Sequence, residues 1–109
     1  MMEEKLEKAT AELVVQNFDL EMNQSIPVRD QLAERIGYLL ENNPILLKSI
    51  FYRIDLNESL LGMALVSMEG ENLYRELADQ VLERMRKKAE WRVKFSQRDS
   101  NLSDGKSDN

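Results

Sequence analysis

The chain has 109 residues, of which 42% are hydrophobic and 32% charged, and its formal net charge is −5. This length and composition fit one folded domain, exclude a chain that is disordered throughout, and favour helices over strands because Leu, Glu, Lys, Arg and Met are abundant. The chain contains no cysteine and no histidine, which excludes disulfides and thiolate metal sites and removes the commonest general base.

The first predicted element is an amphipathic helix. Apolar residues recur every four positions from Leu6 to Met22, which is the spacing of one helical face. Glu3 and Glu4 suit the positive end of its dipole. We expect this helix to carry more apolar surface than one copy of the chain can bury. It would therefore pack on a second subunit in a homodimer.

Two further helices are predicted by their boundaries. Pro27 is placed to begin a helix that has apolar residues on one face between positions 32 and 40. Asn43 is a good N-cap for the next helix and Pro44 an ideal first residue. The third helix, Ile45–Ile54, is apolar over most of its circumference. It is therefore expected at the centre of the fold.

The last two helices are also marked by their ends. Asn57 is the expected N-cap of a helix over 58–68, which Gly70 would close in the left-handed conformation. A fifth helix follows and continues through Trp91 to Phe95, which would make it the longest element. Its apolar stripe consists of Leu73, Leu77, Val81, Met85 and Ala89.

These elements predict an all-α fold, a single-domain antiparallel bundle of four to five helices over residues 1–95. Residues 96–109 are rich in Ser, Asp and Asn, and they are expected to form a disordered tail. No apolar run approaches the roughly 20 residues of a membrane span, so no transmembrane segment is expected. The acidic start of the chain argues against a secretory signal, and the cytoplasm is the expected location.

Charge is distributed unevenly along the chain. Residues 1–83 carry seven basic and sixteen acidic side chains, whereas residues 84–98 carry seven basic side chains and one acid, Glu90. The basic stretch also holds the only tryptophan. This combination of one sign of charge with aromatic side chains is the feature of the chain that indicates a partner. The candidate binding residues are Arg84, Lys87, Lys88, Trp91, Arg92 and Phe95.

Several interpretations of the basic stretch remain open at the level of sequence. Its cations could neutralise phosphates while its aromatics stack on bases, or it could dock on anionic lipid. It could also meet an acidic protein surface, including that of a second copy. Alternatively, Trp91 and Phe95 pack on the bundle and the cations only suit the helix C-terminus. We do not expect nucleic acid, because a chain of net charge −5 repels it overall.

A second candidate site is a set of carboxylates at Glu76, Asp79 and Glu83, whose spacing places them on one helix face. Oxygen ligands of this kind suit Mg²⁺. The sequence Glu-Leu-Ala-Asp at 76–79 resembles the E-x-x-D half of the MazG-type nucleoside triphosphate pyrophosphohydrolases. That resemblance implies an all-α enzyme in which a second E-x-x-E pair completes the magnesium site. The alternative interpretation is a solvated acidic helix face.

The leading hypothesis from the sequence is a small non-enzymatic module for protein–protein interaction or assembly. It needs no cofactor, and its partner is another protein or a second copy of itself. Magnesium-dependent nucleotide hydrolysis and binding to nucleic acid or an anionic surface are the alternatives.

Overall fold

The computed structural model describes residues 2–106, with side chains up to Phe95. Within these residues all regular structure is helical, which confirms the predicted all-α class and a five-helix fold. The predicted tail at 96–109 falls outside the residues whose side chains are described. The helices are α1 (Met2–Phe18), α2 (Val28–Asn42), α3 (Pro44–Arg53), α4 (Glu58–Ser67) and α5 (Gly70–Lys106).

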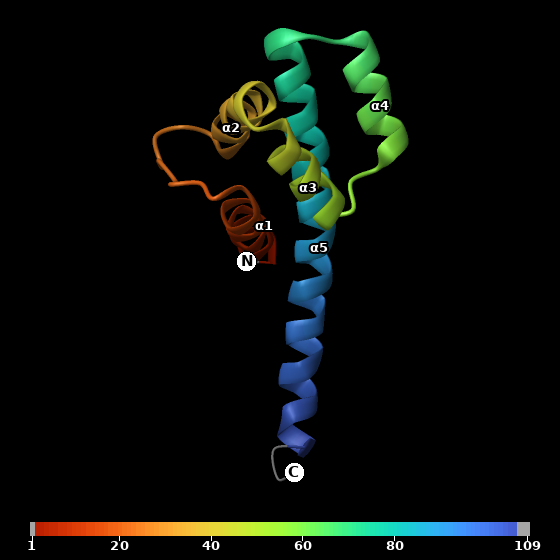
Figure 1. Cartoon of the computed structure of the whole chain (residues 1–109). Helices are drawn as coiled ribbons and strands as arrows, with labels where there is room; N and C mark the ends of the chain where they lie inside the picture. The colour runs from red at the N-terminus through yellow and green to blue at the C-terminus, as the bar shows by residue number, and fades with distance from the viewer. Residues whose placement is uncertain (1, 107–109) are drawn as a thin grey trace.

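Helix α5 is the central element. In Figure 1, α1 and α2 lie across α5, α4 runs beside its first turns in the opposite direction, and α5 continues beyond all of them. The predicted stripe on α5 is buried throughout, from Leu73 to Ala89. This stripe receives apolar side chains from the other helices, so the longest helix organises the core.

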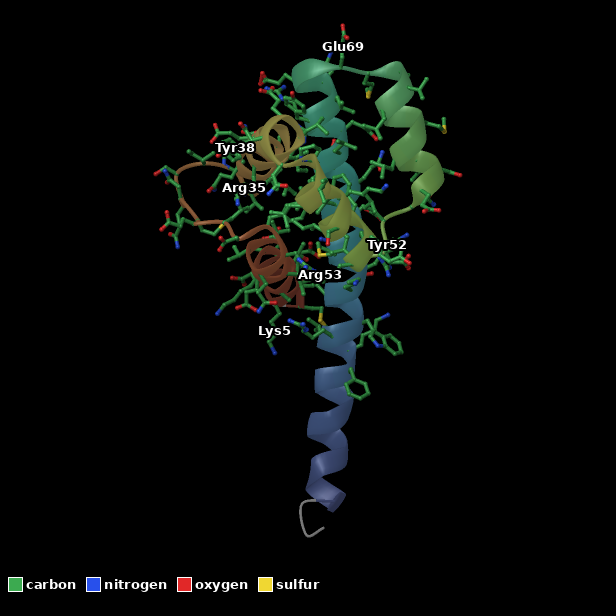
Figure 2. All side chains as sticks on the ribbon, in the orientation of Figure 1. Lys5, Arg35, Tyr38, Tyr52, Arg53 and Glu69 are labelled. Carbon is green, nitrogen blue, oxygen red and sulfur yellow. The ribbon has the colours of Figure 1, made fainter. Side chains whose placement is uncertain are left out.

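The prediction that residues 45–54 occupy the centre is wrong. Helix α3 buries Leu47, Ile50 and Phe51, but the side chains of Ile45 and Tyr52 are 81% and 85% exposed. Tyr52 points away from the core in Figure 2. Although α3 is apolar on several sides, it lies at the surface of the fold, and only one of its sides is covered by other helices.

The apolar stripe of α1 is covered within the chain. Leu6, Leu13, Val14 and Phe18 are all buried, and α1 packs against α5. The helix ends at Phe18 rather than Met22, because Asp19 adopts the left-handed conformation with φ 52°. The reason for expecting a second subunit on α1 is therefore removed, since the fold itself uses this surface.

The predicted helix boundaries are confirmed where they depend on local chemistry. The Asn43 side chain accepts a hydrogen bond from Leu46 N at 3.3 Å, and Pro44 is the first residue of α3. The Asn57 side chain accepts one from Leu60 N at 3.0 Å at the start of α4. Gly70 has the predicted positive φ, 61°, but it begins α5, and α4 has already ended at Ser67.

The end of α1 is held by arginines from two other helices. Arg35 of α2 donates to Phe18 O at 3.1 Å, and Arg53 of α3 donates to Asn17 O at 3.3 Å. Figure 2 labels Arg35 beside α2 and Arg53 beside α1. A guanidinium suits this position because the last carbonyls of a helix lack partners and carry its negative dipole.

Candidate interaction surface

The aromatic side chains of the basic stretch are exposed. Trp91 is 69% exposed and Phe95 52% exposed, and both lie on α5 beyond the last fully buried residue, Ala89. The interpretation in which they pack on the bundle is therefore wrong. Lys87 and Arg92 are exposed as well, and Lys88 is half-buried.

The direction of this aromatic surface follows from helix spacing. Gln80 donates to Leu60 O of α4 at 3.1 Å, and Arg84 donates to Ile54 O after α3 at 3.0 Å. Trp91 follows Arg84 by seven residues, which is two helical turns, and Phe95 follows Trp91 by four. These residues therefore lie on the side of α5 that faces α3 and α4.

Arg84 has a different role from the other predicted binding residues. Its side chain is one-third exposed, donates to Ile54 O and lies 3.6 Å from the carboxylate of Asp55. Leu56 N also closes the end of α3 by donating to Phe51 O. Arg84 therefore fixes the end of α3 to α5 and is not available to a partner.

We expect the substitution Arg84→Ala to lower the free energy of unfolding by about 1–2 kcal/mol, because it leaves the carbonyl of Ile54 without its charged donor. The control is Lys87→Ala one turn further on, which should change the free energy by less than about 0.5 kcal/mol. Urea unfolding followed by far-UV circular dichroism measures both. Equal effects of the two substitutions would contradict the structural role of Arg84.

A groove leads from this surface between α3, α4 and α5. The groove has a volume of about 1060 Å³, and Arg84 and Lys87 are among the residues that line it. Apolar side chains and both signs of charge line it. The lining includes Lys48, Phe51, Tyr52, Leu56, Glu58, Leu60, Leu61, Glu76 and Glu83. A partner seated on the aromatic end of α5 would therefore meet apolar and charged groups in the same surface.

The carboxylates of the second candidate site do not converge. Arg29 of α2 binds both oxygens of Asp79, at 2.6 and 2.9 Å, and Gln80 donates to Glu76 at 3.1 Å. The hydrogen bond to Asp79 raises the pKa of Arg29 above its ordinary value. Among the residues described, no three acidic side chains come together in a way that could hold a metal ion. The spacing on one helix face was misleading, because Asp79 is drawn to α2.

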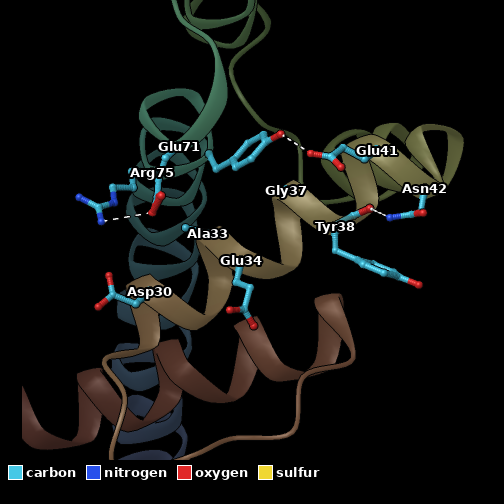
Figure 3. A pocket seen from close by; sticks show the side chains of 10 residues that line it. Asp30, Ala33, Glu34, Gly37, Tyr38, Glu41, Asn42, Glu71 and Arg75 are labelled. Atoms are coloured by element: carbon cyan, nitrogen blue, oxygen red, sulfur yellow. Dashed lines mark hydrogen bonds and ion pairs between the residues drawn. The ribbon is translucent and has the colours of Figure 1, made fainter.

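A second hollow lies between α2 and the start of α5 (Figure 3). It has a volume of about 510 Å³. The Tyr74 hydroxyl donates to Glu41 at 2.9 Å across it, and this bond, with burial, raises the pKa of Tyr74 above its ordinary value. Arg75 pairs with Glu71 at 3.5 Å. Four polar side chains of this hollow are therefore paired with one another and offer little to a ligand.

The apolar surface of α4 was missed by sequence reasoning. The sequence predicted the helix but not its exposure, and within α4 only Ala64 is buried. The available signal was composition, because a helix that is apolar on all sides cannot be covered by one neighbour. The exposed side chains are Leu60, Met63, Leu65, Val66 and, just after the helix, Met68.

Comparison with known proteins assigns no family to this chain. The chain matches no protein-family model, no curated protein and no solved structure. The resemblance to MazG-type enzymes thus depends on the short motif at 76–79 alone. Within the residues described, no helix has the length and apolar character needed to cross a membrane.

Proposed function

We propose that this protein is a non-enzymatic interaction module that binds an acidic surface of another protein through the end of α5. The binding surface, the basic–aromatic face, comprises Lys87, Lys88, Trp91, Arg92 and Phe95. The observation that carries this proposal is the exposure of Trp91. A large aromatic side chain left in water beside several cations is the composition of an interface hot spot.

The chemistry of the face favours contacts that combine burial with charge. Burying Trp91 and Phe95 against a partner would remove apolar surface from water, at roughly 25 cal/mol for each Å². The lysines and Arg92 would steer an acidic partner into register. Because long basic side chains also cover apolar surface with their stems, they suit the rim around the two aromatics.

The extent of the cationic region favours a protein over a continuous polyanion. Glu83 and Glu90 are exposed on the same helix, and Arg86 is already paired with Glu3 of α1 at 3.0 Å. A nucleic acid or an anionic bilayer presents negative charge over a wide area and would meet these acids and the acidic body of the chain. A local acidic patch on a protein can match the cations alone.

Trp91 provides its own assay because it is the only tryptophan. We expect its emission to shift to shorter wavelength when a synthetic amphipathic peptide with acidic and apolar residues is added. Duplex DNA and vesicles containing phosphatidylserine are added in parallel titrations. A shift with DNA or vesicles, and none with the peptide, would contradict the proposal in favour of the corresponding alternative.

The role of the cations is tested with a variant that removes their charges and keeps Trp91 as the fluorescent reporter. The combined substitution Lys87→Ala, Lys88→Ala and Arg92→Ala should weaken peptide binding by roughly 3- to 150-fold, since each surface charge contributes about 0.2–1 kcal/mol. Lys5→Ala with Lys8→Ala, on exposed positions of α1, is the control and should bind like the wild type. Circular dichroism verifies the fold of each variant. Unchanged binding by the triple variant would remove the cations from the interface.

A further inference from the structure

The outer side of α4 is an uncovered apolar surface, separate from the basic–aromatic face. Val66 is 88% exposed and Met63 67% exposed, and they lie three residues apart on the same side of the helix. Helix α4 packs on α5 along one side through Ala64. Figure 1 shows α4 at the margin of the molecule with one neighbour beside it. Its outer side therefore meets no element of the described chain.

This surface carries no charge along its length. Residues 59–68 contain no acidic and no basic side chain, and the nearest charges are Glu58 and Glu69 at the two ends. A surface with several charges of one sign would repel its own copy across a twofold axis. An uncharged apolar side is self-complementary, because the same residues can face each other across a twofold axis without repulsion.

Gly62 is an independent observation on the same helix. It lies in the interior of α4, and a Cβ added to it would meet nothing within 4 Å. A glycine in a helix interior is less favourable than alanine by about 1 kcal/mol. The fold of one chain gives no packing reason for this glycine. Close approach of a second backbone would give one.

We propose that a second copy of the chain packs its own α4 against this side, so that Gly62, Met63 and Val66 lie at the centre of a symmetric interface. Burying a large aliphatic side chain completely removes about 100 Å² of apolar surface from water. The exposed fractions of Met63, Leu65 and Val66 then supply on the order of 200 Å² from each copy. Even with a polar rim the interface stays below roughly 1,000 Å² in total, which is the size of a weak contact.

This area predicts a weak dimer rather than an obligate one. Analytical ultracentrifugation of the full chain should show a monomer–dimer equilibrium with a dissociation constant on the order of 10–100 µM. Gly62→Leu should leave a monomer at all concentrations, because its side chain enters open space in one copy but separates the two helices. Val66→Glu should do the same by placing like charges opposite each other.

The control is Ile45→Glu, which adds the same charge at an equally exposed apolar position of α3. This variant should dimerise like the wild type. A concentration-independent monomer, or a dimer that Gly62→Leu and Val66→Glu leave unchanged, would overturn the proposal. Binding of the wild-type chain to neutral phosphatidylcholine vesicles would also overturn it, since lipid would then be the occupant.

Folding and partner binding can be separated from dimerisation. Gly62→Leu should unfold in urea no earlier than the wild type, because no atom of the chain obstructs the new side chain. Val66→Glu should retain the Trp91 response to the acidic peptide, since that surface is on another helix. If Val66→Glu abolishes the dimer but keeps the Trp91 response, dimerisation through α4 and partner binding through α5 are independent. Failure of one proposal can then be distinguished from failure of the other.

Discussion

Replacing Phe18 with alanine is expected to lower the free energy of unfolding by about 3–5 kcal/mol. Phe18 is 1% exposed and belongs to the single core that joins α1 to α5. Truncation removes most of a buried aromatic side chain, and the surrounding helices can fill the space only in part. For a domain whose total stability is of the order of 5–15 kcal/mol, this loss is a large fraction.

The matched control is Tyr52→Ala, which truncates an aromatic side chain that is 85% exposed. Its effect should be within about 0.5 kcal/mol, because little apolar surface is returned to water. Urea unfolding at low protein concentration measures both variants in the monomer. A Phe18→Ala variant that loses less than about 1 kcal/mol would mean that α1 does not dock on α5 as described.

The features that the sequence predicted correctly depend on neighbouring residues. The caps at Asn43 and Asn57 follow from one side chain and the backbone amide three residues on. The stripe from Leu73 to Ala89 follows from a helical period sustained over several turns. Such interactions form whatever the rest of the chain does, so their pattern is visible without the fold.

The features that the sequence could not predict concern which surface covers which. Ile45 was expected at the centre of the fold, because a pattern identifies an apolar side but not the element that packs on it. Asp79 read as a free carboxylate, although Arg29, fifty residues earlier, binds it. Trp91 could have been buried or exposed for the same reason. In each case the environment of the side chain depends on whether a residue distant in the sequence packs on it or binds it.

The two proposed surfaces have a joint consequence. A dimer formed through α4 would carry two copies of the basic–aromatic face on one particle. A partner with repeated acidic segments could then bind both, and the second contact would be intramolecular, which raises the apparent affinity without any new contact. Because the dimer is expected to be weak, this gain would depend on the concentration of the protein.

The second large effect is expected at Gly37 of α2, which lies against the ring of Tyr74 of α5. A Cβ at this position would lie 2.7 Å from two ring atoms of Tyr74, and the ring is held by its hydroxyl on Glu41. Figure 3 labels Gly37 on α2 at the edge of the hollow between α2 and α5. We expect Gly37→Leu to lower the free energy of unfolding by about 2–3 kcal/mol, because overpacking outweighs the gain in helix propensity.

Gly62→Leu is the matched control for this substitution, since it makes the same exchange on a helix where the new side chain meets open space. It should leave the stability of the monomer unchanged or slightly higher. The cause is tested by combining Gly37→Leu with Tyr74→Ala. If the Tyr74 ring is the obstacle, the double variant should lose less stability than the sum of the single variants, by about 1 kcal/mol or more. Additive losses would place the strain elsewhere, and an equal cost at both glycines would show that helix α2 does not depend on close contact with α5.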